Sequence, residues 1–128
     1  MTKMKTVITT DAGGRPVGPY SQAVRANGLI YLSGQIPADP ETGAIVDGAI
    51  AAQTDRVLRN VAAILTAAGS SMDKVVRCTV FLMNMNDFGS MNEVYATFFR
   101  ENPPARTTVA VAQLPKDALI EIQATAVE

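Results

Sequence analysis

Two long stretches with the periodicity of an amphipathic helix constrain the fold most, because each is followed by a short segment typical of a β-strand. Apolar residues recur at three- and four-residue spacing from Ala49 to Ala68, and Gly69 follows as a C-terminal cap. A second apolar stripe runs from Asp87, a candidate N-cap, to Glu101, ahead of two prolines that end a helix. Helices that alternate with strands predict an α+β domain in which two helices cover one face of a mixed sheet.

The strands are predicted from alternation, β-branched residues and turn signals. Asn27-Gly28 separates two short apolar segments and is typical of a type I′ hairpin turn. The predicted strands are Lys5–Thr10, Ala23–Ala26, Leu29–Ser33, Lys74–Met83, Arg106–Leu114 and Leu119–Val127. The length of 128 residues fits one domain spanning 1–128. Because the helices cover only one face, the opposite face is free to bury itself against other copies of the chain.

Charged residues are few in the C-terminal third, where Arg106 and Glu121 interrupt apolar strands. A charge on an apolar sheet face is costly to desolvate, so each is either a solvated rim residue or part of a site. If the turn at 115–118 joins the last two strands as a hairpin, Arg106, Thr108 and Glu121 point to one face. Arg106 and Glu121 then lie roughly 20 Å apart along it. A small ligand that touches both would need the arginine of one chain and the glutamate of a neighbour, so the site would lie at a subunit interface.

Composition excludes several classes of function. Eleven basic and twelve acidic residues give a net charge of −1, and the basic residues are scattered, which disfavours nucleic acid and anionic membranes as partners. The first ten residues lack the apolar core of an export signal and no segment is apolar enough to span a bilayer, so a cytoplasmic location is expected. The sequence has no histidine, which removes histidine-based triads and most zinc sites. The single cysteine, Cys78, is expected to be a core thiol.

Four motifs stand in the order and spacing of a known family: GPYSQA at 18–23, SGQIP at 33–37, PAR at 104–106 and LPKDALIEI at 114–122. Together they resemble the RidA/YjgF family of reactive-intermediate deaminases over almost the whole chain. The resemblance implies a chorismate-mutase-like α+β fold and a homotrimer with sites at its subunit interfaces. It also implies hydrolysis, without cofactor or metal, of 2-imino acids such as 2-iminobutanoate and 2-iminopropanoate to 2-keto acids and ammonia.

The resemblance assigns catalytic roles to Arg106, Glu121 and Tyr20. Arg106 matches the arginine that grips the substrate carboxylate, which suits a planar guanidinium; the alternative is a structural ion pair. Glu121 matches the carboxylate that positions the attacking water, and a single carboxylate can carry both proton transfers; the alternative is an exposed sheet residue. Tyr20 matches a tyrosine that closes one wall of the pocket, although an aromatic ring packed beside a Gly-Pro turn is an equally simple explanation.

Further substrate contacts are expected from Ser33, Gly34, Asn92 and Thr108. Ser33 can donate its hydroxyl, and Gly34 has no Cβ to keep a ligand from its backbone. Asn92 aligns with an asparagine that helps to fix the site, or is an exposed polar residue of the helix. Thr108 stands where many relatives have cysteine, so any property of the site that needs a thiol, such as oxidative switching, is in doubt. The Thr108 backbone N–H can still reach the substrate carboxylate. Gln123 replaces a second acidic residue that is usual in the family.

Other functions stay open at this point. A non-catalytic trimer that binds small carboxylates or acts as a chaperone would use the same arginine. A specialised deaminase of a larger enamine would share the fold and the arginine. Ribonuclease activity has been attached to the family, but the absence of histidine and of a basic tract disfavours it.

Overall fold

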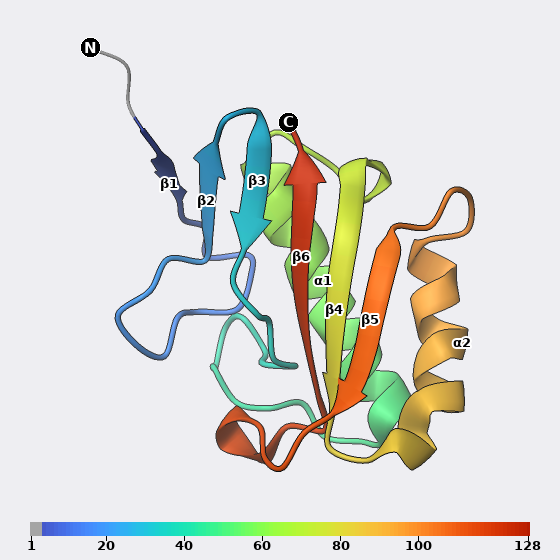
Figure 1. Ribbon diagram of the computed structural model, residues 1–128. Helices are drawn as coiled ribbons and strands as arrows, with labels where there is room; N and C mark the ends of the chain where they lie inside the picture. The colour runs from blue at the N-terminus through green and yellow to red at the C-terminus, as the bar shows by residue number, and fades with distance from the viewer. Residues whose placement is uncertain (1–3) are drawn as a thin grey trace.

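A computed structural model describes residues 4–128 as a six-stranded mixed sheet with two helices packed on one face. The sheet order is β1-β2-β3-β6-β4-β5 (Figure 1). The elements are β1 (Thr6–Ile8), β2 (Ala23–Ala26), β3 (Leu29–Leu32), α1 (Ile50–Ala67), η1 (Met72–Lys74), β4 (Val75–Leu82), η2 (Met85–Asp87), α2 (Phe88–Phe98), β5 (Ala105–Ala110), η3 (Pro115–Asp117) and β6 (Ile120–Val127). The predicted α+β architecture is confirmed.

Helix α1 forms because its apolar residues repeat on one side, and that side faces the sheet. Val57, Val61, Ile64 and Leu65 are fully buried, and burying each side chain contributes roughly 1.5–3 kcal/mol. The helix ends where Gly69 adopts φ +81°, a left-handed conformation that costs glycine little. The predicted helix at 49–68 and its glycine cap are both confirmed.

The hairpin of β2 and β3 also follows from local sequence. Ala26 pairs with Leu29 across a two-residue turn, and both Asn27 and Gly28 have positive φ, at 53° and 79°. Two positive φ values define the type I′ turn, whose twist matches that of the flanking strands. This prediction is confirmed.

Helix α2 is shorter than predicted. It spans Phe88–Phe98 rather than reaching Glu101, and the Asp87 side chain makes no capping hydrogen bond. The side chain of Asn84 caps the preceding turn instead, by accepting from the Asn86 backbone N–H at 2.9 Å. The chain leaves the helical conformation at Phe99, whose ring packs against Tyr95 with centroids 4.7 Å apart. Phe99 is 8% exposed and belongs to the core, and the helix has already ended before the proline pair at 103–104.

The predicted hairpin of the last two strands is wrong. β5 pairs in parallel with β4, and β6 is antiparallel to both β3 and β4, so β4 separates β5 from β6 (Figure 1). The predicted turn at 115–118 is present, because the Leu114 and Pro115 carbonyls accept from the Asp117 and Ala118 N–H groups at 3.2 Å, but it leads β6 away from β5 to the far side of β4. In a central position β6 makes hydrogen bonds along both edges and buries Ile120, Ile122, Ala124 and Ala126 against the helices. A terminal hairpin would leave half of those backbone groups without a strand partner.

The sheet face opposite the helices is not covered by this chain. In Figure 1 that face is turned to the viewer, with α1 behind the sheet. Tyr31, Val109 and Val7 are 46%, 39% and 54% exposed on it. The predicted association through this face stays a prediction. Among residues 4–128, no helix is long and apolar enough to cross a membrane.

Candidate active site

The Glu121 carboxylate lies at the wall of a cavity of about 550 Å³ on the open side of the sheet. The cavity is lined by Val17, Tyr20, Ser33, Gly34, Ile36, Pro115, Glu121 and Gln123. The Glu121 side chain makes no hydrogen bond or ion pair with any of residues 4–128. Burial alone raises the pKa of its carboxyl above the ordinary value. Such a carboxylate can exchange protons with a reacting molecule more readily than one held in an ion pair.

Gly34 allows Glu121 to occupy this position. A Cβ atom on Gly34 would lie 2.8 Å from the Glu121 Cδ atom and 3.1 Å from Cγ, closer than carbon atoms approach. The φ of Gly34 is not positive, so the residue is required here for close approach and not for backbone conformation. The structure thus places the Glu121 side chain of the same chain against Gly34, whereas the expected close approach of a ligand to this backbone stays a prediction.

Tyr20 and Ser33 line the same cavity, but each already has a partner. The Tyr20 hydroxyl accepts a hydrogen bond from the Val17 N–H at 3.0 Å and keeps its own proton free to donate. The Ser33 hydroxyl donates to the Ser21 carbonyl at 2.6 Å. Ser33 is therefore an acceptor toward the cavity in this conformation, whereas the sequence reasoning expected a donor.

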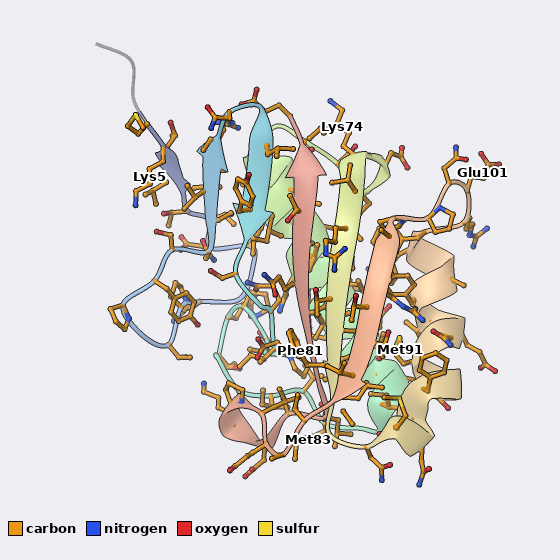
Figure 2. All side chains as sticks on the ribbon, viewed as in Figure 1. Lys5, Lys74, Phe81, Met83, Met91 and Glu101 are labelled. Atoms are coloured by element: carbon orange, nitrogen blue, oxygen red, sulfur yellow. The ribbon has the colours of Figure 1, made fainter. Side chains whose placement is uncertain are left out.

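Arg106 lies on the other face of the sheet, against α2. Its Cα pairs with that of buried Cys78, so both side chains point toward the helices. The guanidinium lies 4.7 Å from the Tyr95 ring centroid and 5.6 Å from that of Phe88, and Nη1 is 4.0 Å from the Met91 sulfur. Figure 2 shows Met91 between α2 and β5. The aromatic rings orient the cation but do not neutralise it, and Arg106 forms no ion pair within the described chain.

Asn92 and Thr108 accompany Arg106 rather than Glu121. Asn92 and Arg106 line a second cavity of about 430 Å³ between α2 and the Pro103-Pro104 segment. The Asn92 Oδ1 and Thr108 Oγ1 atoms are buried and have no hydrogen-bond partner within residues 4–128. The Val111 N–H bonds to the Leu82 carbonyl of β4, so by alternation the Thr108 N–H points away from β4, toward the free edge of the sheet. The arginine, the free Thr108 N–H and the Thr108 hydroxyl can all donate to a small anion, whereas Asn92 Oδ1 can only accept.

The predicted geometry of Arg106, Thr108 and Glu121 is corrected by the strand order. Glu121 pairs with Phe81, whereas Arg106 pairs with Cys78. These two residues are three positions apart on β4, so their side chains face opposite sides of the sheet. With β4 between them, the Arg106 and Glu121 Cα atoms are about 14 Å apart rather than 20 Å. Within one chain the two side chains cannot contact the same small molecule, because the sheet lies between them.

Cys78 is a core thiol, as predicted, with 1% of its surface exposed. Burial raises its pKa, and the adjacent Tyr95 hydroxyl and Arg106 act in the opposite direction. The pKa of Tyr95 is raised as well, first by burial and then by its contact with Cys78. Both groups therefore stay protonated and neutral beneath the arginine.

Four lining residues of the Glu121 cavity were not predicted as site residues. Gln123 shares the face of Glu121 because it lies two residues further along β6, a signal that alternation contains. Val17 and Ile36 come from loops and Pro115 from η3. Ile36 and Pro115 lie within the motifs at 33–37 and 114–122, which gave them no role of their own, and Val17 lies outside the motifs. They give the cavity an apolar wall beside its carboxylate.

The fold and the site define a small mixed-sheet protein. Among residues 4–128 it has a carboxylate without a partner on one face of the sheet and an arginine without an ion pair on the other. Comparison with known proteins identifies the family. The family model described as endoribonuclease L-PSP matches residues 12–128. A RutC family protein of Pyrococcus horikoshii is 55% identical over 123 residues, covering 96% of this chain and 98% of that protein. The human 2-iminobutanoate/2-iminopropanoate deaminase is 44% identical over 125 residues, covering 98% and 91%.

Solved structures show the same fold. The crystal structure of a putative endoribonuclease from Thermotoga maritima superposes with a TM-score of 0.94 at 50% identity, covering 98% of each chain. That of E. coli TdcF with bound serine has a TM-score of 0.92 at 42% identity, covering 96% of this chain and 98% of that one. The chain belongs to the endoribonuclease L-PSP family, which is the RidA/YjgF family.

Proposed function

We propose that the protein is a hydrolytic deaminase that converts small 2-imino acids to 2-keto acids and ammonia at sites shared between neighbouring subunits. The observation that carries the proposal is the separation of two complementary halves. One face presents a carboxylate with no partner, Glu121, and the other presents a cation with no anion, Arg106, within residues 4–128. A second copy that brings its Arg106 to the Glu121 cavity completes a site that neither chain has alone.

A closed homotrimer joins such halves without leaving any of them unused. Each contact is heterologous, since the Arg106 surface of one chain meets the Glu121 surface of the next, and heterologous contacts close into rings. The exposed apolar side chains of the open sheet face, such as Tyr31 and Val109, supply a hydrophobic surface for the assembly. Three sites per trimer follow.

In this site the substrate carboxylate binds to the Arg106 half. The guanidinium offers a planar pair of donors, and the Thr108 N–H at the free edge of β5 adds a third. Stacking on Tyr95 and Phe88 holds the guanidinium in place before substrate arrives, which reduces the entropy lost on binding. Asn92 Oδ1, an acceptor with no partner among residues 4–128, is available to an N–H group.

The Glu121 half performs the proton transfers. With the imine nitrogen protonated, the carboxylate accepts a proton from water as the water oxygen bonds to the imine carbon and the C=N π bond breaks, which gives a neutral carbinolamine. Glu121 then returns this proton to the nitrogen. It takes the carbinolamine hydroxyl proton as the C–N bond breaks and the C=O bond forms, so that ammonia leaves a 2-keto acid. The raised pKa of Glu121 suits a group that both takes and gives a proton near neutral pH. The Tyr20 hydroxyl proton is free to bond the water or the imine nitrogen.

The names of relatives support a short substrate. The mouse, rat and human relatives are named for 2-iminobutanoate and 2-iminopropanoate, and the TdcF structure contains serine, a small amino acid with a carboxylate. That bound serine also favours a second candidate, a trimer that binds small carboxylates without turnover. Both candidates use Arg106, but only the deaminase needs Glu121 as a base.

A mixing experiment tests the shared site. The imine is generated in situ by an amino-acid oxidase or dehydratase, and keto acid release is followed with and without the protein. Glu121→Gln and Arg106→Ala should each abolish the acceleration. When the two variants are unfolded together and refolded in equal amounts, roughly a quarter of the sites receive an intact arginine and an intact glutamate from different chains, so about that share of activity should return.

The outcomes separate the candidates. Activity that does not return on mixing, although each variant alone is trimeric, contradicts a site shared between chains. Wild-type protein that binds serine but leaves the imine lifetime unchanged contradicts deamination and supports the binding candidate. RNA cleavage that persists in both variants would point to a different active site altogether.

A further inference from the structure

Two glutamines from the recognised motifs, Gln22 and Gln35, have no part in the chemistry above, yet both are almost completely buried. Gln22 is 3% exposed and Gln35 is 4% exposed. A buried carboxamide destabilises the fold unless its groups are hydrogen-bonded. Their partners therefore indicate what the two side chains do.

Gln22 ties the segment after β1 to β2. Its Oε1 accepts from the Thr10 N–H at 2.8 Å, and its Nε2 donates to the Thr10 carbonyl at 2.9 Å and to the Gly14 carbonyl at 2.7 Å. Two of these hydrogen bonds hold the Thr10 backbone, and the third holds the Gly14 carbonyl.

Gly14 in turn packs against the Gln35 side chain. A Cβ atom on Gly14 would lie 2.8 Å from Gln35 Oε1, so the glycine and the carboxamide are in direct contact. Gln35 Nε2 donates to the Ser33 carbonyl at 3.2 Å, so the carboxamide contacts the Ser33-Gly34 peptide from the helix side of the sheet. The Gln35 carboxamide is thus held between Gly14 and the peptide that carries Gly34.

The backbone of Gln35 links this support to β6. Its N–H donates to the Ile122 carbonyl at 2.8 Å, and the Ile122 N–H donates back at 3.0 Å. This two-bond bridge joins the residue after Gly34 to the residue after Glu121. Gly34 therefore lies on the open face against the Glu121 side chain, while the Gln35 side chain lies beneath it.

We infer that Gln35, supported by Gln22 through Gly14, is a positioning residue that holds the Ser33-Gly34 peptide against Glu121 and thereby sets the orientation and solvation of that carboxylate. The inference rests on the proposed function for its catalytic consequence, but its structural consequence can be measured without turnover. Loss of the Gln35 carboxamide frees the Ser33-Gly34 peptide to move, and water then reaches Glu121.

The test compares Gln35→Met, which keeps the length of the side chain but removes its hydrogen bonds, with Gly14→Ala, whose Cβ displaces the Gln35 carboxamide. Leu65→Ala, a fully buried core position that lines neither cavity, controls for general destabilisation. The Glu121 pKa is measured by carboxyl carbon NMR, assigned with Glu121→Gln. Steady-state kinetics are measured on the same proteins.

In Gln35→Met the Glu121 pKa should fall toward its ordinary value, and kcat should fall about tenfold or more with KM within about twofold. Gly14→Ala should lower the Glu121 pKa and kcat as well. If Gln35→Met does not fold, the Gly14→Ala variant alone tests the inference. Leu65→Ala should change neither. A Glu121 pKa that stays at its wild-type value in the variants overturns the inference, whereas absence of turnover in the wild type overturns only the proposed function.

Discussion

Substitution of Gly34 by alanine should remove most of the activity while leaving the fold nearly as stable as before. The new Cβ would lie 2.8 Å from Glu121 Cδ, and carbon atoms in contact are ordinarily 3.5 Å or more apart, so Cδ must retreat by at least about 0.7 Å and Oε2, which lies closer still, by more. A misplacement of about 1 Å can reduce the rate about 100-fold, so we expect kcat to fall roughly 10- to 100-fold.

The effect on stability should be small because two terms oppose each other. Overpacking costs about 1–3 kcal/mol, near the lower end here because the Glu121 side chain is half-buried and can move. Replacing glycine by alanine where φ is not positive stabilises by about 0.4–1 kcal/mol through the unfolded chain. The free energy of unfolding should therefore fall by about 1 kcal/mol or less.

The assay is keto acid release from an imine generated in situ, with denaturant unfolding of the same samples. Gly89→Ala in α2 is the matched control, because a Cβ there meets nothing within 4 Å. It should keep wild-type kcat and gain up to about 1 kcal/mol of stability. Wild-type kcat in Gly34→Ala would refute the reasoning that the Gly34–Glu121 contact sets the position of the catalytic carboxylate.

Two further predictions concern stability. Burial raises the pKa of Glu121, so the folded protein binds the proton of this carboxyl more tightly than the unfolded chain does. Stability is therefore lost as pH rises above the ordinary pKa of 4.5 and Glu121 ionises in the folded protein. Glu121→Gln should therefore raise Tm at about pH 8, and the gain should shrink with falling pH and vanish below about pH 4; a gain of equal size at both pH values would contradict this. Gly69 has a φ of +81° and open space around it, so Gly69→Ala should lower the free energy of unfolding by about 1 kcal/mol through strain at the helix cap. Denaturant titration measures this change. An unchanged midpoint would show that the end of α1 does not depend on the glycine cap.

Much of the candidate site was predictable as a set of residues but not as an arrangement. Tyr20, Ser33, Gly34 and Glu121 were predicted from motifs, and the structure places all four around one cavity. Arg106 was predicted for the same site but lies on the other face of the sheet, because its strand pairs with β4 and not with β6. Val17, Ile36 and Pro115 complete the cavity wall, but no role could be assigned to them from the motifs, since their proximity depends on how separate segments fold over the sheet.

The sequence alone determined the features that depend on neighbours a few residues apart: the length and buried side of α1, its cap at Gly69, and the type I′ turn at Asn27-Gly28. Only the tertiary structure decided how the last three strands pair. The sequence favoured joining the last two strands because they are adjacent in the chain, whereas the folded protein inserts β6 between β3 and β4. There β6 gains hydrogen bonds on both edges and buries one whole face against α1. Local sequence patterns do not show this long-range gain, and the strand order that it favours decides on which face of the sheet Arg106 and Glu121 lie.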